Sequence, residues 1–225
     1  MDPRAPASDD TVMTALPSLD VLVAFTAASF VLIITPGPDM TLFIGQTLTA
    51  GRARGFAALM GASTGIFLHA MLAAFGLSAL LAASATAFAL VKIAGVLYLL
   101  WLAIAALRHG SALTLKPASA GKPPLWRIYL TGLGVNLLNP KIVMFFVTFL
   151  PQFVSAADPQ AGAKLLFLGL YFIVLALPAC SALILSADRF TAAIRRSKRI
   201  MRIVDYSFAG LMAAFAVRLV LTRGN

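Results

Sequence analysis

The sequence predicts an all-α, polytopic membrane protein with six transmembrane helices. Of its 225 residues, 60% are hydrophobic and 12% are charged, whereas soluble domains average about 45–50% apolar and 25% charged residues. Six apolar stretches also approach the roughly 20 residues that a helix needs to cross a bilayer. Lys and Arg, finally, are concentrated in every second connection between these stretches. The predicted spans are Leu19–Leu48, Gly55–Leu81, Ala87–Leu107, Ile128–Val154, Leu165–Ala187 and Ile203–Leu221.

The first span is interrupted by Pro36, Gly37 and Pro38, which are followed directly by Asp39. A proline in a helix interior lacks the amide donor and clashes with the preceding turn. A charged side chain at the bilayer centre costs about 2.5–3.5 kcal/mol or more. Broken backbone and charge at this depth are tolerated where they line a cavity inside the protein. The segment is therefore predicted to line a solute pathway.

The fourth span carries a corresponding interruption at Asn139 and Pro140, followed by Lys141 and preceded by Asn136. When the two halves of the chain are superposed, Pro38 falls on Pro140. Because each half holds three spans, the second copy must be inverted in the membrane. Inverted repeats with interrupted helices near the midplane are a recurring transporter design. We therefore predict two inverted three-helix repeats in which helices 1 and 4 are interrupted.

The chain is predicted to form one integral membrane domain with a polar tail and one linker. The tail contains three Asp residues and several prolines and is predicted to be disordered. The linker is rich in Pro and Gly and separates the two repeats. The predicted parts are the tail 1–18, the first repeat 19–107, the cytoplasmic linker 108–127 and the second repeat 128–225.

Positive charge predicts the orientation of the spans. Twelve of the 18 Lys and Arg residues lie in the first, third and fifth connections, including a run at 189–202. Cytoplasmic loops carry such an excess, so we place the odd-numbered connections in the cytoplasm and both termini outside. The run at 189–202 anchors this topology, and binding of anionic lipid headgroups to it stays open.

Several motifs in fixed order resemble a known family. They are Thr35-Pro36-Gly37-Pro38-Asp39, Gly61-x3-Gly65-x3-His69, Lys92-x2-Gly95-x2-Tyr98-Leu99, Asn136-Leu137-Leu138-Asn139-Pro140-Lys141 with Phe145-Phe146, and Pro151-Gln152-Phe153. Together they resemble the LysE/RhtB family of bacterial amino-acid exporters, and the likeness covers nearly the whole chain after residue 18. The resemblance implies a secondary active exporter in the bacterial inner membrane, which moves amino acids out of the cytoplasm by proton antiport.

The substrate is predicted from the charges in the spans. Asp39 is the acidic residue placed deep in a span, and a dibasic substrate would favour a second negative group. A neutral, threonine/homoserine- or leucine-like amino acid is therefore favoured over a dibasic one. Three alternatives remain open: a channel built on the same broken helices, a cation exporter of the same superfamily, and a membrane scaffold without transport.

The predicted substrate and proton pathway follows the two breaks. Helix N-termini attract anions, and freed carbonyls accept hydrogen bonds from an ammonium group, so a zwitterion fits between the breaks. Asp39 and Lys141 are expected to meet and form a pair that substrate or a proton switches; the alternative is a static ion pair. The predicted pathway residues are Pro36, Gly37, Pro38, Asp39, His69, Asn136, Asn139, Pro140 and Lys141.

His69 is either a proton relay, since its pKa is near neutral, or a hydrogen-bonded packing residue. Gly61, Gly65 and Gly95 are predicted to permit close helix packing. No enzyme signature is present, and two His with one Cys leave little for a metal site. We predict no cofactor and no metal. The expected partners are the substrate, protons and membrane lipids but no nucleic acid; a homo-oligomer stays open.

Overall fold

A computed structural model describes residues 16–77, 123–155 and 158–187, together with isolated positions between 93 and 217. Every regular element in these parts is helical, as the sequence predicts. Other predictions fall on residues outside the described parts. These are residues 1–15 of the tail, most of the third and sixth spans, Gly95, most of the 108–127 linker and most of the basic run 189–202.

The first predicted span is a bent pair of helices, α2 (Leu19–Ile34) and α3 (Pro38–Ala50), at 52° to each other. The chain leaves the helical conformation at Thr35, whose backbone is extended. Pro38 occupies the first turn of α3, where its missing amide donor costs nothing. The prolines therefore end one helix and start the next within the same span.

The fourth predicted span is bent in the same way. It consists of α7 (Leu125–Leu137), then α8 (Pro140–Met144), which continues through a π-helical turn η2 (Phe145–Phe149) and a 3₁₀ turn η3 (Leu150–Phe153). The two parts meet at 50°. Pro140 again opens the second helix, and Asn139 caps it, because its side chain accepts a hydrogen bond from the amide of Lys141.

Two long helices complete the described bundle. One is α4 (Arg52–Leu72), which runs on into the π-helical segment η1 (Ala73–Leu77), and the other is α9 (Ala161–Leu185). Pro178 lies within α9 without ending it. By length and composition, two helices of the described residues could cross a membrane, or up to four spans if each bent pair is counted as one.

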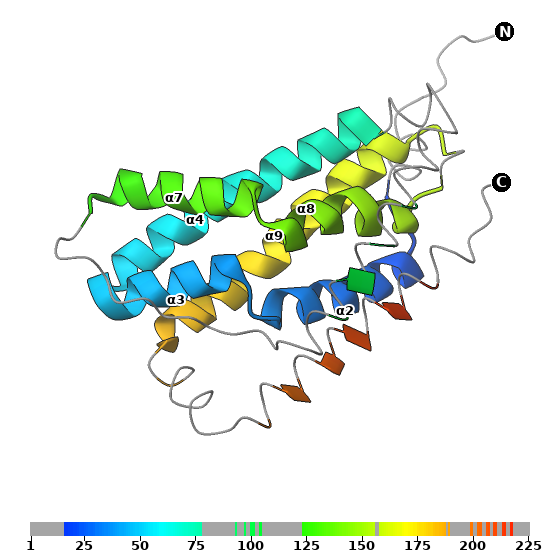
Figure 1. The fold of residues 1–225 in the computed structure, drawn as a ribbon. Helices are drawn as coiled ribbons and strands as arrows, with labels where there is room; N and C mark the ends of the chain where they lie inside the picture. Colours follow the sequence, from blue (N-terminus) through cyan, green and yellow to red (C-terminus); the bar gives the residue numbers. More distant parts are fainter. Residues whose placement is uncertain are drawn as a thin grey trace, which may run out of the picture.

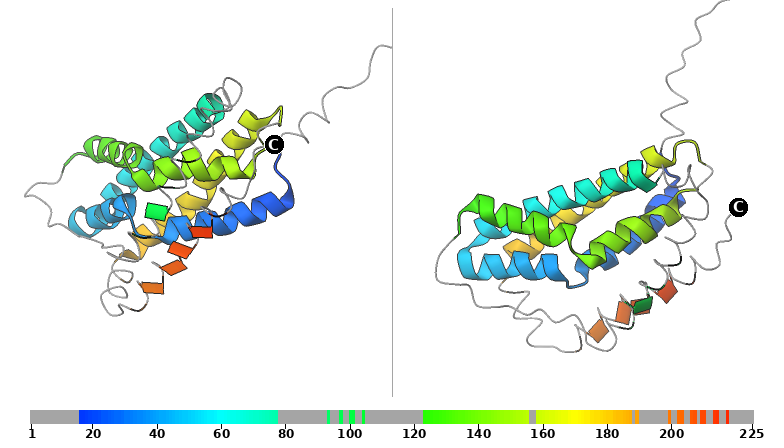
Figure 2. Two further views of the ribbon diagram at one scale, coloured as in Figure 1. Left: turned by 45° about the vertical axis from the view of Figure 1, so that its right-hand side comes forward. Right: turned by 45° about the horizontal axis from the view of Figure 1, so that its top comes forward.

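The bent pairs run in opposite directions along the molecule (Figure 1), and so do α4 and α9. Both further views keep this antiparallel arrangement (Figure 2). The most extensive helix contact joins α4 to α7. It depends on glycine, because a methyl group on Gly61 would lie 1.9 Å from the carbonyl oxygen of Tyr129, and one on Gly132 would lie 2.2 Å from that of Ala58. The two backbones therefore touch.

Two arginines tie the connections at the left-hand end in Figure 1, where α3, α4, α7 and α9 each begin or end. The guanidinium group of Arg52 donates to the carbonyl of Leu185 at the end of α9. Arg54 donates to the carbonyl of Pro123, just before α7, and to that of Ala50 at the end of α3. The first connection and the described ends of the third and fifth thus lie at the same end of the bundle.

Beyond the breaks, the half of the bundle that contains the start of α2 has an aromatic core. The rings of Phe145 and Phe172 lie with centroids 4.8 Å apart, and those of Phe149 and Phe153 lie 4.9 Å apart. Phe25 of α2 packs on Phe153 at 5.2 Å. The breaks thus lie between this aromatic core and the glycine-mediated contact of α4 with α7.

Candidate functional site

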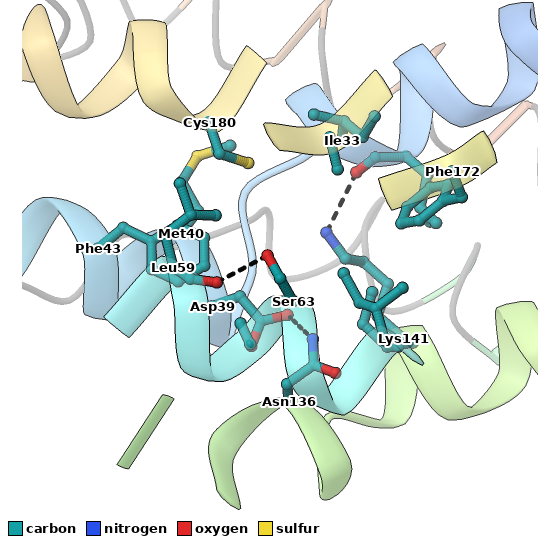
Figure 3. A pocket seen from close by; sticks show the side chains of 15 residues that line it. Ile33, Asp39, Met40, Phe43, Leu59, Ser63, Asn136, Lys141, Phe172 and Cys180 are labelled. Carbon is teal, nitrogen blue, oxygen red and sulfur yellow. Dashed lines mark hydrogen bonds between the residues drawn. The ribbon is translucent and has the colours of Figure 1, made fainter. Parts of the chain in front are cut away.

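A pocket opens where the two bent helices approach each other, between α4 and α9 (Figure 3). Its walls are mostly apolar, and its polar groups come from the two breaks and from Ser63 of α4. The residues that line it are Leu32, Ile33, Asp39, Met40, Phe43, Leu59, Ala62, Ser63, Ile66, Asn136, Lys141, Ile142, Phe172, Ala176 and Cys180.

Asp39, in the first turn of α3, is held by the opposite break. Its Oδ2 accepts hydrogen bonds from the side-chain amides of Asn136 and Asn139, each at 2.9 Å. Asn136 is fully buried and Asn139 nearly so. Within the described residues, the Oδ1 of Asp39 is buried and has no hydrogen-bond partner. The carboxylate therefore keeps one free acceptor beside the pocket.

Lys141, in the first turn of α8, is held by the first break in return. Its Nζ donates to the carbonyl of Thr35 at 2.9 Å and to that of Leu32 at 3.2 Å. In an unbroken helix the carbonyl of Leu32 would accept from the residue four positions on, but this residue is Pro36, which has no amide hydrogen. The ammonium group thus takes over an acceptor that proline has freed.

The expected direct ion pair between Asp39 and Lys141 is not formed. In the part of the chain that the structure describes, the ion pair observed joins Asp158 and Lys164. Each charge at the breaks instead binds polar groups of the other break, because the freed carbonyls and the two Asn amides lie nearer. Each charge also suits the helix end beside which it lies, since a carboxylate is stabilised at the N-terminus of α3 and a cation at the C-terminus of α2.

Helix α4 supports this arrangement from behind. A methyl group on Gly65 would lie 2.5 Å from the Oδ1 of Asn136, so the glycine provides the room in which Asn136 sits. One turn further on, His69 lies near the backbone of Asn136. His69 is 8% exposed and stacks on Phe146, with ring centroids 5.7 Å apart. Its Nε2 is buried without a hydrogen-bond partner in the described residues.

Some of the pathway residues predicted from sequence line the pocket, and the others hold the lining residues in place. Asp39, Asn136 and Lys141 line the pocket, whereas His69 does not. Asn139 bonds to Asp39, Gly37 lies against the Nζ of Lys141, and the three prolines form the breaks. Gly61 and Gly65 lie at the contact of α4 with α7, as described, and Gly95 lies outside the described residues.

Several pocket residues lie outside the two breaks, and the sequence analysis did not predict them. Phe172, Ala176 and Cys180 follow each other at intervals of four, so they lie on one face of α9. Ser63 and its neighbours Leu59, Ala62 and Ile66 form the equivalent stripe on α4. Helical spacing alone could have grouped each set, but not shown that both face the breaks.

No group of three or more His, Cys, Asp or Glu side chains that could hold a metal ion comes together in the described residues. The hydrogen-bonding groups of the pocket are one carboxylate, one ammonium, amides, a hydroxyl and freed carbonyls. Such a set offers a hydrogen-bonding partner to each end of a zwitterion.

The LysE type translocator family model matches residues 30–223. The homoserine/homoserine lactone efflux protein of Salmonella typhimurium is 30% identical over 200 residues, which cover 89% of this chain and 96% of that protein. A leucine efflux protein of Enterobacter sp. is 28% identical over 201 residues, 87% of this chain and 92% of the relative. The uncharacterized membrane protein YahN of Escherichia coli is 26% identical over 216 residues, with coverages of 94% and 93%. No solved structure gives a significant match. The chain belongs to the LysE type translocator family.

Proposed function

We propose that this protein exports small neutral amino acids, homoserine- or leucine-like, from the cytoplasm by proton antiport and alternating access. The observation that carries the proposal is the pocket between two broken helices, in which a carboxylate and an ammonium group each lie against an otherwise apolar wall. The relatives, which are named for efflux of homoserine, homoserine lactone and leucine, support the same direction of transport.

The two ends of an amino acid have partners in this pocket. The α-carboxylate can accept from the ammonium group of Lys141, which has three donors. The α-ammonium group has two sets of acceptors at the breaks, namely the free Oδ1 of Asp39 and the carbonyls of Leu32 and Thr35, on which Lys141 now rests. The side chain would lie against Met40, Phe43 and Phe172. A second carboxylate for a dibasic side chain is missing from the lining residues that the structure describes, which favours a neutral substrate.

Proton coupling is assigned to Asp39, with His69 as a second candidate. Both carry a buried atom without a hydrogen-bond partner among the described residues, namely Oδ1 of Asp39 and Nε2 of His69, so each has a free position for a proton. Protonation of Asp39 would weaken its attraction for a substrate ammonium group. A proton that enters from outside would thus help to release the substrate there.

The proposed architecture has six helices in two inverted repeats, with the odd-numbered connections in the cytoplasm and both termini outside the inner membrane. The opposite directions of the bent pairs, and of α4 and α9, support this arrangement. So does the contact of Arg52 and Arg54 with the ends of α9 and of the linker, because it gathers the basic connections at one end. In an alternating-access cycle the two repeats would move against each other about the pocket.

The test is export of amino acids against a gradient. Cells that overproduce the protein are loaded with dipeptides, and the amino acids released to the medium are measured against an empty-vector control. Inside-out vesicles then report whether an imposed pH gradient concentrates the same amino acid. Equilibration without accumulation would indicate a channel, and no release above the control for any amino acid would leave a non-transporting scaffold.

The native thiol offers a second, independent readout. Cys180 lines the pocket and is the one cysteine in the sequence. A transported amino acid should therefore slow the alkylation of Cys180 by a small thiol reagent, while an amino acid that is not exported should not. Equal rates with both amino acids would place substrate binding elsewhere.

A further inference from the structure

In the part of the chain that the structure describes, the side chain of Lys141 binds main-chain carbonyls and no carboxylate. Its Nζ donates to two carbonyl oxygens, those of Leu32 and Thr35, at 3.2 and 2.9 Å. We propose that the end of α2 is a binding site for a primary ammonium group, which Lys141 fills when substrate is absent and which the substrate's α-ammonium group takes during transport.

The break makes the site. Pro36 removes the amide hydrogen that the carbonyl of Leu32 would otherwise accept, and the extended backbone at Thr35 turns the next free carbonyl away from the helix ladder. The end of a helix also carries partial negative charge. Two carbonyl oxygens in this field suit a donor that has several N–H groups and a positive charge.

The shape of the site also suits a small alkylammonium group. A methyl group on Gly37 would lie 3.2 Å from the Nζ of Lys141 and 3.4 Å from its Cε, so the glycine leaves room for the end of an alkyl chain. The backbone of Gly37 is extended, with φ −162°, and any residue can adopt this conformation. Its missing side chain is therefore explained by the ammonium group beside it and not by backbone strain.

The second observation is the free acceptor on the other side of the pocket. The Oδ1 of Asp39 is buried and, among the described residues, has no partner, although Lys141 lines the same pocket. A substrate ammonium group that takes the carbonyls of Leu32 and Thr35 releases Lys141, and Asp39 is the acceptor to which Lys141 can then turn. Lys141 thus has two alternative partners. In the empty transporter it binds the carbonyls of Leu32 and Thr35, and in the loaded transporter it binds the carboxylate of Asp39.

This inference rests on the proposed function in one respect, namely that the competing ligand is an amino acid. The consequence for transport is a reset step: after release, Lys141 returns to the carbonyls. It then neutralises the end of α2 without a bound solute, so the empty carrier can change its conformation.

The test is chemical replacement of the Lys141 side chain. Lys141→Ala removes three methylene groups and the ammonium group, which together correspond to propylammonium. The purified variant is titrated with propylammonium chloride, and the midpoint of thermal unfolding (Tm) is recorded. We expect Tm to rise by about 2–4 °C in Lys141→Ala and to stay constant in the wild type, whose site is filled.

Two salts and one variant serve as controls. Tetramethylammonium chloride has the same charge but no N–H donor, and sodium chloride has no alkyl part, so neither should raise the Tm of Lys141→Ala. Lys141→Met keeps most of the side-chain volume without a donor, and should be less stable than the wild type and insensitive to propylammonium. An equal response to all three salts, or an equal response of variant and wild type, would overturn the proposal.

Recovery of the variants is informative too. If Lys141→Ala can be purified only with propylammonium present, the site is supported. If it cannot be recovered even then, or if Lys141→Met has wild-type stability, Lys141 only fills space and the ammonium site is refuted. This experiment does not measure export. If the protein shows the propylammonium response but exports no amino acid, the proposed function is wrong and the ammonium site stands. If it exports amino acids but shows no propylammonium response, the proposed function stands and the ammonium site is refuted.

Discussion

Gly61 of α4 and Tyr129 of α7 are in backbone contact, since a methyl group on Gly61 would lie 1.9 Å from the carbonyl oxygen of Tyr129. Gly61→Ala must therefore push the two helices apart, and we expect the free energy of unfolding to fall by about 1–3 kcal/mol. Thermal unfolding of the purified protein measures the loss.

Gly134 provides the matched control for this substitution. It lies in α7, the helix that Gly61 contacts, but a methyl group there meets nothing within 4 Å in the described residues. Gly134→Ala should be neutral or should stabilise the helix by up to about 1 kcal/mol, because alanine has the better helix propensity. Equal losses in the two variants would mean that the contact of α4 with α7 does not limit stability.

Gly65→Ala is predicted to impair export at a distance from the pocket. The added methyl group would displace Asn136, whose amide holds Asp39. We expect the export rate to fall by about tenfold or more, since a displaced charge-assisted hydrogen bond is worth about 1.5–3 kcal/mol. The rate is compared at equal protein amounts with that of Gly45→Ala, a substitution in α3 with open space around it in the described parts. Normal export by Gly65→Ala would exclude a positioning role for Asn136.

Asp39→Asn is predicted to keep the fold and lose coupled export. An amide oxygen at this position can still accept from Asn136 and Asn139, so the hydrogen bonds that join the breaks remain. The negative charge and the proton acceptor are lost, and we expect accumulation in inside-out vesicles to fall by about 10–100-fold. Lys141→Met should be impaired in the same assay. Full proton-driven accumulation by both variants would show that the charges of Asp39 and Lys141 are not needed for coupled export.

A pH-dependent contribution to stability is predicted for Asp158, which lies in the connection between η3 and α9, outside the predicted spans. The hydrogen bond from Lys164, and then that from the backbone amide of Gln160, hold the pKa of Asp158 below its ordinary value of 3.8. The folded state therefore favours the carboxylate. This contribution is complete above pH 3.8 and is lost as the pH falls through the lowered pKa.

Asp158→Asn should accordingly lower the free energy of unfolding at pH 7 by about 0.2–1 kcal/mol, the range for an ion pair at a protein surface. The difference from the wild type should shrink as the buffer is acidified below pH 3.8. Lys164→Met should show the same loss at neutral pH. A difference that grows in acid would contradict the sign derived from the lowered pKa.

The orientation of the chain is predicted to place the C-terminus outside the inner membrane. Alkaline phosphatase fused to the C-terminus should be active, and green fluorescent protein fused there should be dark. The reverse pair of results would put the C-terminus in the cytoplasm. This would require either a different number of spans or an orientation with the Lys- and Arg-rich connections outside.

The interruptions of the helices could be predicted from sequence, because proline chemistry is local. Pro38 and Pro140 lack an amide hydrogen wherever they stand, and both begin a helix in the structure. Helix limits were less accurate: α4 begins at Arg52 rather than Gly55, and α7 at Leu125 rather than Ile128. Apolar content marks the stretch that suits hydrocarbon, whereas a helix can continue past it into polar surroundings.

The partners of the charged residues could not be predicted from sequence. Equivalent repeat positions with opposite charge suggested a direct pair of Asp39 and Lys141. Which acceptor a flexible lysine takes depends on the three-dimensional position of freed carbonyls, and the bend between α2 and α3 sets this position. The fold class and the helix breaks thus follow from local chemistry. That each charge binds polar groups of the other break depends on how the two breaks are placed in the folded protein.

This arrangement has a consequence for the two halves as separate polypeptides. A fragment with the first break alone would leave Asp39 without the Asn side-chain amides that bind it. A fragment with the second break alone would leave the ammonium group of Lys141 in the membrane without its carbonyl acceptors. Each fragment is then a poor membrane protein by itself, and co-expression of both in one cell should rescue them from proteolysis. Each half of this chain therefore needs the other for stability, whether or not a peptide bond joins them.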